Sequence, residues 1–160
     1  FVDGGDLLDS INNDGCWPEE RTAHLLRQIS GAIALLHAQG VCHADVKPEN
    51  ILLTAEGQVR LVDFGLSCEL SNGVGVSRGT HMYWPPELWN TGQAGLPMDL
   101  WGLGIILYML LSGFHPFDAD AEGDVAAIAR SIRKDEPCFD EWPASDEARE
   151  LVIALLRKDD

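Results

Sequence analysis

An apolar segment in the second half of the chain limits the possible folds more than any other feature. Residues 100–111 carry no charged side chain, and the run is far shorter than the roughly 20 apolar residues that a membrane-spanning helix needs. Pro97 suits the first turn of a helix, and apolar residues fall on every face of the predicted helix 98–112. The sequence therefore predicts a helix buried within the protein, around which the rest of the chain packs.

Three more helices are predicted from apolar residues at helical spacing. The first begins near Pro18 and Glu19 and ends at Gly40, the second lies around residues 125–132, and the last has Ser145 as its N-cap. The apolar residues that mark them are Leu25, Leu26, Ile29, Ile33 and Leu36, then Val125, Ile128, Ala129 and Ile132, and finally Leu151, Val152, Leu155 and Leu156, the last four expected on the inner face of their helix.

Two short apolar runs interrupt this helical pattern. Residues 51–54 and 59–62 are joined by a turn-forming segment that contains Gly57, which predicts an antiparallel hairpin. Residues 66–96 are rich in Gly, Ser, Asn and Pro without a sustained period, which predicts a long loop that is functional or mobile. The expected fold class is mainly α with one small antiparallel β-hairpin.

The charge of the chain favours some partners over others. Eleven Lys and Arg against 26 Asp and Glu give a net charge of −15. Such a chain repels phosphate backbones and anionic lipid headgroups, so neither nucleic acid nor a membrane is expected as a partner. A basic peptide or protein substrate is expected instead.

The four cysteines show no ligand spacing. They form no CxxC pair, so neither a zinc site nor a disulfide framework is predicted, and buried free thiols in a reducing compartment are expected. The four positions are Cys16, Cys42, Cys68 and Cys138.

Polar residues gather on both sides of the predicted hairpin. Asp45 can orient or deprotonate a hydroxyl, and Lys47 can reach a phosphate. Asn50 and Asp63 offer the oxygen ligands that magnesium prefers. Because antiparallel strands return the chain to its starting edge, the hairpin is expected to bring Asp63 beside Asn50.

Each of these residues alone has an ordinary structural explanation, but their joint spacing is specific. The segment HADVKPEN at residues 43–50, followed by Asp-Phe-Gly at 63–65, resembles the eukaryotic protein kinase family. The resemblance covers all 160 residues and only the C-terminal lobe of a kinase. Further matching segments are GTHMYWPPE at 79–87, DLWGLG at 99–104 and GFHPF at 113–117. The opening segment looks most like the calcium/calmodulin-dependent group.

The resemblance implies an ATP- and Mg²⁺-dependent protein serine/threonine kinase. It assigns catalysis to Asp45 and Lys47, and the binding of ATP with its metal to Asp6, Lys47, Glu49, Asn50, Leu52 and Asp63, with Asn50 and Asp63 as the metal ligands. It assigns substrate binding to Asp6, Glu49, Gly79 and Thr80, and structural support to His43, Phe64, Gly65, Glu87 and Asp99. The Lys47 and Thr80 pair goes with serine/threonine specificity, and Asp6 and Glu49 with basic substrates. The other histidines are expected to be packing or surface residues: His24, His37, His81 and His115.

The sequence departs from the family pattern at Ala44, where an Arg is usual. That Arg normally pairs with a phosphate on the activation loop. Phosphorylation of Ser71 or Ser77 is therefore not expected to switch activity through this position. The arginine that would pair with Glu87 is expected beyond Asp159, so Glu87 lacks its usual partner in this chain.

The chain contains no glycine-rich phosphate loop and no strand lysine of the VAIK type. Residues 1–160 are therefore expected to be a partial kinase domain, without the N-terminal lobe and the last helices. The missing lobe would be required for ATP binding, and the fragment alone is expected to be inactive. The alternatives are a pseudokinase that acts as a binding module and, less favoured, a natural stand-alone regulatory half. A cytoplasmic location is expected, with the nucleus left open.

Overall fold

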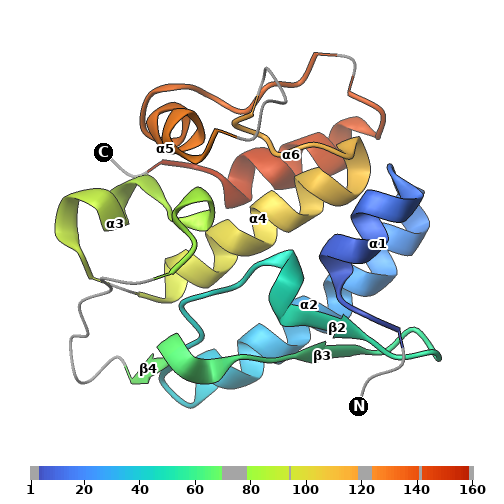
Figure 1. Ribbon diagram of the computed structural model, residues 1–160, viewed down its shortest axis with the longest axis horizontal. Coiled ribbons are helices and arrows are strands. Elements are labelled where there is room, and N and C mark those ends of the chain that lie inside the picture. Colours follow the sequence, from blue (N-terminus) through green and yellow to red (C-terminus); the bar gives the residue numbers. More distant parts are fainter. Residues whose placement is uncertain (1–3, 70–78, 94, 119–123, 141, 159–160) are drawn as a thin grey trace.

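The structure is a computed structural model that describes residues 4–69, 79–93, 95–118, 124–140 and 142–158. It is mainly helical, with two small antiparallel strand pairs (Figure 1). The predicted mainly α fold is confirmed, but the prediction of a single hairpin is incomplete. Among the described residues, no helix is both long and apolar enough to cross a membrane.

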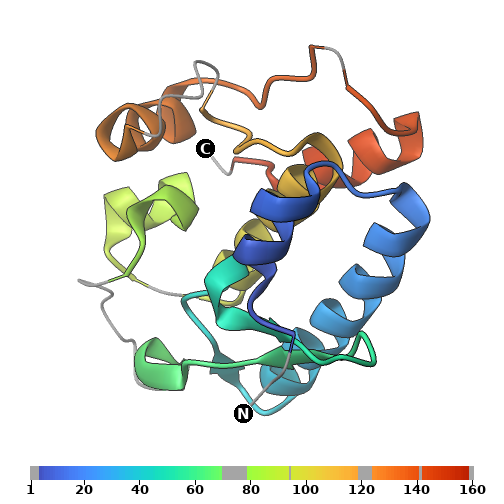
Figure 2. The ribbon, with the colours of Figure 1, turned by 45° about the vertical axis from the view of Figure 1, so that its right-hand side comes forward.

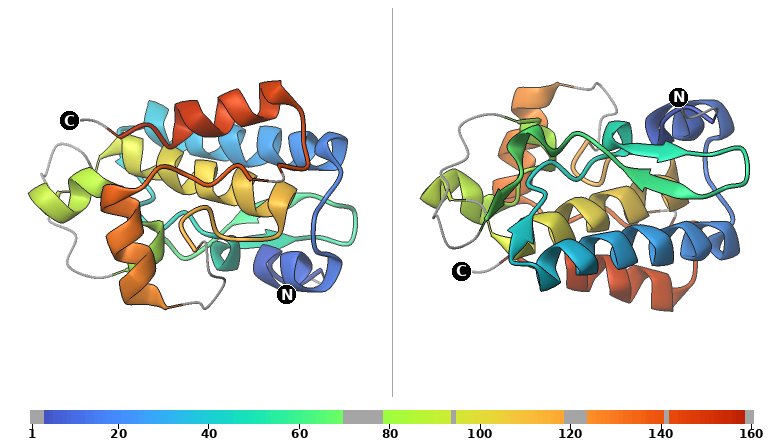
Figure 3. Two further views of the ribbon diagram at one scale, coloured as in Figure 1. Left: turned by 90° about the horizontal axis from the view of Figure 1, so that it is seen from above. Right: turned by 90° about the horizontal axis from the view of Figure 1, so that it is seen from below.

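The predicted apolar helix is α4, Leu96–Ser112, and it forms the centre of the core. Helices α2, Glu19–Ala38, and α6, Asp146–Leu155, run alongside it (Figure 3). Two glycines make close contacts possible. A Cβ at Gly102 would meet the carbonyl oxygen of Val46 at 2.4 Å, and one at Gly104 would meet the Cβ of Leu155 at 2.8 Å. These glycines therefore let the 43–50 loop and α6 approach the α4 backbone.

Helix α6 begins as its sequence predicts. The Ser145 side chain accepts a hydrogen bond from the Ala148 amide at 3.2 Å, and its hydroxyl donates to Glu19 Oε1 at 2.8 Å. This contact ties the start of α6 to the start of α2. The expected inner face is wrong at Leu151, which is 45% exposed, whereas Val152 and Leu156 are buried.

The predicted hairpin is confirmed as β2, Ile51–Leu53, paired with β3, Val59–Leu61. A second antiparallel pair joins β1, Val41–Cys42, to β4, Cys68–Glu69. Two residues are too few to show the alternation that marks a strand. This pair was therefore not predicted.

Several short elements also lie outside the prediction. The expected loop 66–96 contains β4, a 3₁₀ turn at His81–Tyr83 and helix α3, Pro86–Thr91, so that prediction is wrong over those residues. Helix α3 is too short to show a periodic apolar face, although it ends at Gly92 with the left-handed φ of 65° that favours glycine. Other short helices are α1, Leu7–Asp14, and the 3₁₀ turns η1, Pro48–Asn50, and η2, Phe64–Leu66.

Helix α1 lies against the hairpin side of the molecule, where it contacts η1 and β2 (Figure 2). Helix α5, Val125–Lys134, matches its prediction and contacts the 3₁₀ turn at His81–Tyr83. The polar 43–50 loop is thus enclosed by α1, α4 and the hairpin.

Candidate active site

A buried carboxylate on α4 holds the start of the 43–50 loop. Asp99 is fully buried, and its Oδ1 accepts a hydrogen bond from the Ala44 amide at 2.9 Å. Its Oδ2 accepts from the His43 amide at 2.9 Å and lies 2.8 Å from His37 Nε2. Hydrogen bonds to a charged group are among the stronger ones in proteins. Asp99 therefore fixes the loop backbone to the central helix.

His43 connects this loop to the exit of the hairpin. Its Nε2 lies 3.0 Å from the Val62 carbonyl oxygen, and its Nδ1 accepts the Asp45 amide at 3.3 Å. The ring packs edge-on against Phe64, with the centroids 4.9 Å apart. Both ring nitrogens are engaged, so His43 braces the loop and has no nitrogen left to act as a base.

Four predicted site residues come together at the next turn of the chain. Asp45 is 8% exposed, and its Oδ2 accepts from Asn50 Nδ2 at 2.9 Å and pairs with Lys47 Nζ at 3.0 Å. Lys47 Nζ also donates to Thr80 Oγ1 at 2.6 Å. A single network thus joins a carboxylate, an ammonium, an amide and a hydroxyl from two distant segments.

The hairpin returns the chain to Asn50 at Val62, the residue before Asp63. The Val62 amide donates to the Asn50 carbonyl at 3.0 Å, which extends the β2–β3 pairing by one step, and Asp63 follows directly. Asp63 has a left-handed φ of 61°, and its Oδ1 accepts from the Gly65 amide at 3.2 Å. Such a backbone conformation is uncommon outside glycine and is characteristic of functional turns. The Asp63 side chain is exposed.

The oxygens of Asn50 and Asp63 suit a magnesium ion that is shared with phosphates. The Asn50 amide nitrogen is engaged by Asp45, which leaves Asn50 Oδ1 without a donor among the described residues. No group of three or more His, Cys, Asp or Glu side chains in the described ranges could hold a metal alone. Magnesium commonly takes one or two protein oxygens and completes its shell with phosphate and water. The residues present therefore fit this cation.

The predicted substrate residues lie around the same network in different settings. Glu49 has a buried Oε2 that finds no hydrogen-bond partner in the described structure. Asp6 caps α1 by accepting the Asp9 amide at 2.8 Å, and its backbone bridges to Leu52. Gly79 has a φ of 136°, and a Cβ there would lie 3.0 Å from Trp84 Nε1. Asp6 is thus partly committed to a structural role, whereas Glu49 keeps an unused acceptor.

Ala44, where the family pattern has Arg, lies in apolar surroundings. Its side chain is fully buried and its φ is 64°. It belongs to a buried group that we name the Ala44 cluster: Cys42, Ala44, Cys68, Trp84, Leu88 and Met98. Ser71 and Ser77, the two predicted phosphorylation positions, lie outside the described residues.

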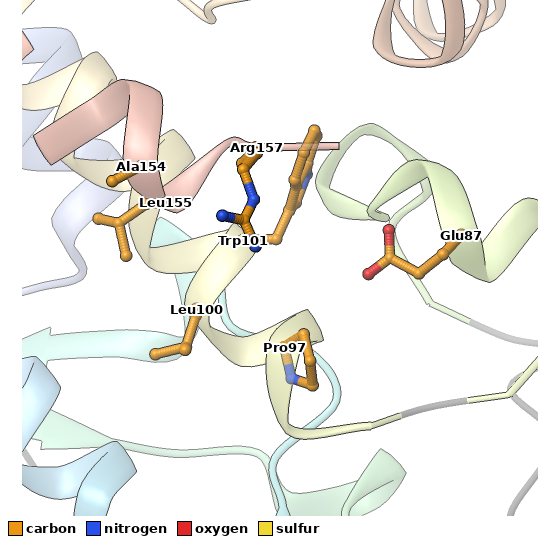
Figure 4. A pocket seen from close by; sticks show the side chains of 7 residues that line it. All are labelled: Glu87, Pro97, Leu100, Trp101, Ala154, Leu155 and Arg157. Carbon is orange, nitrogen blue, oxygen red and sulfur yellow. The ribbon is translucent and has the colours of Figure 1, made fainter. Parts of the chain in front are cut away.

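Glu87 on α3 lines a cavity of about 210 Å³ between α3, α4 and the end of α6 (Figure 4). The other lining residues are Pro97, Leu100, Trp101, Ala154, Leu155 and Arg157. Glu87 and Arg157 each take part in an interaction. The arginine expected beyond Asp159 is therefore not needed to keep Glu87 engaged.

Two histidines have structural roles that the sequence did not reveal. His37 contacts Asp99, as described above, and His115 Nε2 lies 3.0 Å from the Met82 carbonyl oxygen, while its Nδ1 accepts the Phe117 amide at 3.3 Å. Burial lowers the pKa of His115 to about 4, so it is neutral near pH 7. Burial, and then the Glu49 and Asp45 carboxylates, raise the pKa of Tyr83. A single His in a helix or loop carries no spacing signal, so neither contact was predictable.

Comparison with known proteins supports the same reading. The protein kinase domain family matches residues 1–160. CBL-interacting serine/threonine-protein kinase 16 of Arabidopsis thaliana is 38% identical over 99% of this chain and 36% of its own length. Human calcium/calmodulin-dependent protein kinase type 1B is 36% identical over 99% of this chain and 48% of its own length.

A third relative, serine/threonine-protein kinase PKZ1 of Phytophthora infestans, is 33% identical over 98% of this chain and 45% of its own length. The chain thus spans between about a third and a half of the length of these relatives. The resemblance inferred from the HADVKPEN and Asp-Phe-Gly segments is confirmed, including the likeness to serine/threonine and calcium/calmodulin-dependent kinases. The chain belongs to the protein kinase family.

Proposed function

We propose that the protein containing this chain transfers the γ-phosphoryl group of ATP to serine or threonine of a protein substrate. The observation that supports this most is the Asp45 network, because it places a carboxylate, an ammonium and a side-chain amide within one hydrogen-bonded group. Phosphoryl transfer depends mainly on positioning and on charge stabilisation of this kind. Family membership supplies the expectation of ATP and magnesium.

In this proposal Asp45 orients the attacking hydroxyl and accepts its proton. Lys47 and Asn50 both engage Oδ2, which leaves Oδ1 without a partner among the described residues. Oδ1 is thus the atom that receives the proton. The two contacts on Oδ2 also prevent the carboxylate from rotating, which keeps Oδ1 aimed at the acceptor.

Lys47, Asn50 and Asp63 handle the phosphate end of the reaction. The Lys47 ammonium lies between Asp45 and Thr80, where it can neutralise charge on the transferred group. We assign Asn50 Oδ1 and the Asp63 carboxylate to a magnesium ion. When bound, that ion orients the phosphates and offsets their charge.

Substrate choice follows from the groups around the network. The 2.6 Å contact from Lys47 Nζ to Thr80 Oγ1 supports the serine/threonine class that the family pattern implies. Glu49 is only half-buried and carries the negative charge that a cationic substrate side chain requires. The net charge of −15 favours a basic substrate as well. We retain Asp6 as a second acidic contact, and Gly79 as part of the substrate floor.

We further propose that residues 1–160 form the C-terminal part of a kinase domain and act only with an N-terminal lobe. The chain has no glycine-rich loop or VAIK-type lysine to hold the phosphates of ATP. This part alone is then inactive, and Leu52 completes the nucleotide site only when that lobe covers it. We place the protein in the cytoplasm, where ATP and protein substrates are available.

The test is phosphoryl transfer by the complete protein and by its Asp45→Asn variant, with ATP, magnesium and a basic serine peptide. We expect the variant to lose about 100-fold or more in kcat, because the proton acceptor is removed. The matched control is Glu56→Gln in the exposed hairpin turn, which should retain the parent rate. Equal, measurable rates for the parent and Asp45→Asn would remove Asp45 from the mechanism, whereas no phosphoryl transfer by either protein would favour the pseudokinase alternative.

A further inference from the structure

Two cysteines lie directly opposite each other in the strand pair that the sequence did not predict. Cys42 in β1 is the register partner of Cys68 in antiparallel β4. Opposed residues in antiparallel strands have Cα atoms about 4.5 or 5.5 Å apart, and disulfide-bonded residues have Cα atoms about 4.4–6.8 Å apart. The Cα separation of an opposed antiparallel pair is therefore within the range of a disulfide. Both cysteines are free thiols in this structure.

The surroundings distinguish the two thiols. Cys42 is fully buried, and its Sγ donates to the Gly95 carbonyl oxygen at 3.2 Å. Cys68 is 8% exposed. Burial, with a further contribution from the Asp99 carboxylate, raises the pKa of both thiols. Both groups are thus kept protonated, and Cys68 is the more accessible to a reagent from solvent.

We propose that Cys42 and Cys68 form a reversible disulfide when the protein meets hydrogen peroxide. Because the thiolate is the nucleophile, the Cys68 thiol first loses its proton to solvent. Its sulfur then attacks one peroxide oxygen, the O–O bond breaks, and the released hydroxide takes up a proton, which leaves a sulfenic acid and one water. The Cys42 sulfur then displaces the hydroxyl group from Cys68, and its proton leaves with that oxygen as a second water. The two thiols lose two electrons in total, which reduce the peroxide.

The position of this cross-link gives it a direct connection to the candidate site. A bond between residues 42 and 68 closes a covalent loop that contains Asp45, Lys47, Asn50 and Asp63. Because β1 ends one residue before His43, the bond would fix the start of the 43–50 loop to the segment after Asp-Phe-Gly. An effect on phosphoryl transfer rests on the proposed function, whereas the cross-link itself does not.

The experiment exposes the complete, folded protein to hydrogen peroxide, blocks remaining thiols with iodoacetamide and digests it with trypsin without reduction. Arg60 lies between the two cysteines, so cleavage there leaves peptides that only a disulfide can join. We expect a joined pair whose mass is two hydrogens below the sum of the separate peptides, and which dithiothreitol separates. Cys16→Ser, at an exposed position, should keep the pair, and Cys42→Ser should lose it.

Recovery of Cys42 and Cys68 as separately alkylated peptides after peroxide treatment would overturn the proposal. Joining of either residue to another cysteine, or oxidation of Cys68 alone to an acid, would overturn it as well. Phosphoryl transfer, measured on the protein before and after peroxide treatment, separates the disulfide proposal from the proposed function. If the protein shows no phosphoryl transfer before peroxide is added but still forms the joined pair afterwards, the proposed function fails and the disulfide proposal stands.

Discussion

The backbone of Ala44 lies in a polar environment and its side chain in an apolar one, so the 43–50 loop is held in two different ways. On the backbone side, the His43 and Ala44 amides are held by the buried Asp99 carboxylate. On the side-chain side, Ala44 packs within the apolar Ala44 cluster that includes Trp84 and Leu88. Hydrogen bonds to a charge are directional, whereas apolar packing depends on volume. The two sides should therefore respond differently to substitutions that conserve shape.

The largest difference is expected between Asp99→Asn and Trp84→Phe. In Asp99→Asn, the new NH₂ group points at one of the N–H groups that now donate to Asp99, so that hydrogen bond is lost. The free energy of unfolding should therefore fall by about 3–4 kcal/mol. Trp84 Nε1 has no hydrogen-bond partner in the described structure, so Phe removes volume without breaking a bond. Its cost should be about 1–2 kcal/mol.

Urea unfolding of the three proteins measures both values. The exposed pair of Arg21 and Asp14, 2.9 Å apart, supplies a control, since Asp14→Asn should change stability by less than about 1 kcal/mol. Equal losses for Asp99→Asn and Trp84→Phe would contradict this prediction, because they would show that the Asp99 hydrogen bonds hold the loop no more strongly than the apolar packing does.

The next effect concerns His115, a buried residue that contacts the Met82 carbonyl oxygen. The pKa of His115 is lowered to about 4 in the folded protein, against about 6.5 when unfolded. Its contribution to stability is therefore fully present above pH 6.5 and is lost as the pH falls toward 4. His115→Gln, which can still donate to Met82, has no such titration. Relative to this variant, the parent should lose about 3 kcal/mol of unfolding free energy between pH 7 and pH 4.

Denaturant unfolding of both proteins across this range gives the difference directly. Comparing the two proteins cancels the titration of the many carboxylates they share. A difference that stays constant with pH would mean that the pKa of His115 is the same in the folded and the unfolded protein, as for a solvated ring, and would contradict this prediction.

The smallest effect is expected from charge on the predicted activation loop. Ala44 offers no cation to a phosphate and is enclosed by apolar residues. Glu at Ser71 and Ser77 in the complete protein should therefore change kcat less than about twofold, since no charge-assisted contact forms through this position. A steady-state peptide assay measures the change. A large increase that an added Ala44→Arg change does not alter would contradict this account.

Local signals made much of the fold predictable from the sequence. Ser145 is a helix cap that acts through its own hydrogen bond, and the apolar residues of α4 have no soluble arrangement except burial. The β1–β4 pair was not predictable, because Val41–Cys42 and Cys68–Glu69 pair only after the chain has folded. Leu151 was misplaced because a helix with apolar residues at consecutive positions does not define its inner face.

The candidate site likewise has a part that was predictable from the sequence and a part that was not. The segments 43–50 and 63–65 were recognisable by spacing, and the hairpin between them was expected to bring Asp63 back to Asn50. The contacts of His37 with Asp99 and of His115 with Met82 join residues far apart in the chain. No periodicity or motif within one segment encodes such contacts. The same holds for the pairing of Cys42 with Cys68.

The central claim is that Asp63 and Asn50 hold the metal of a bound nucleotide while Asp45 acts on the acceptor. Calorimetric titration of the complete protein with ATP, with and without magnesium, tests it most directly. In Asp63→Asn the gain in affinity that magnesium provides should be lost, whereas in Asp45→Asn it should remain within about twofold of the parent, because Asp45 is assigned no metal contact. Magnesium-dependent ATP binding that survives in Asp63→Asn and disappears in Asp45→Asn would contradict the assignment.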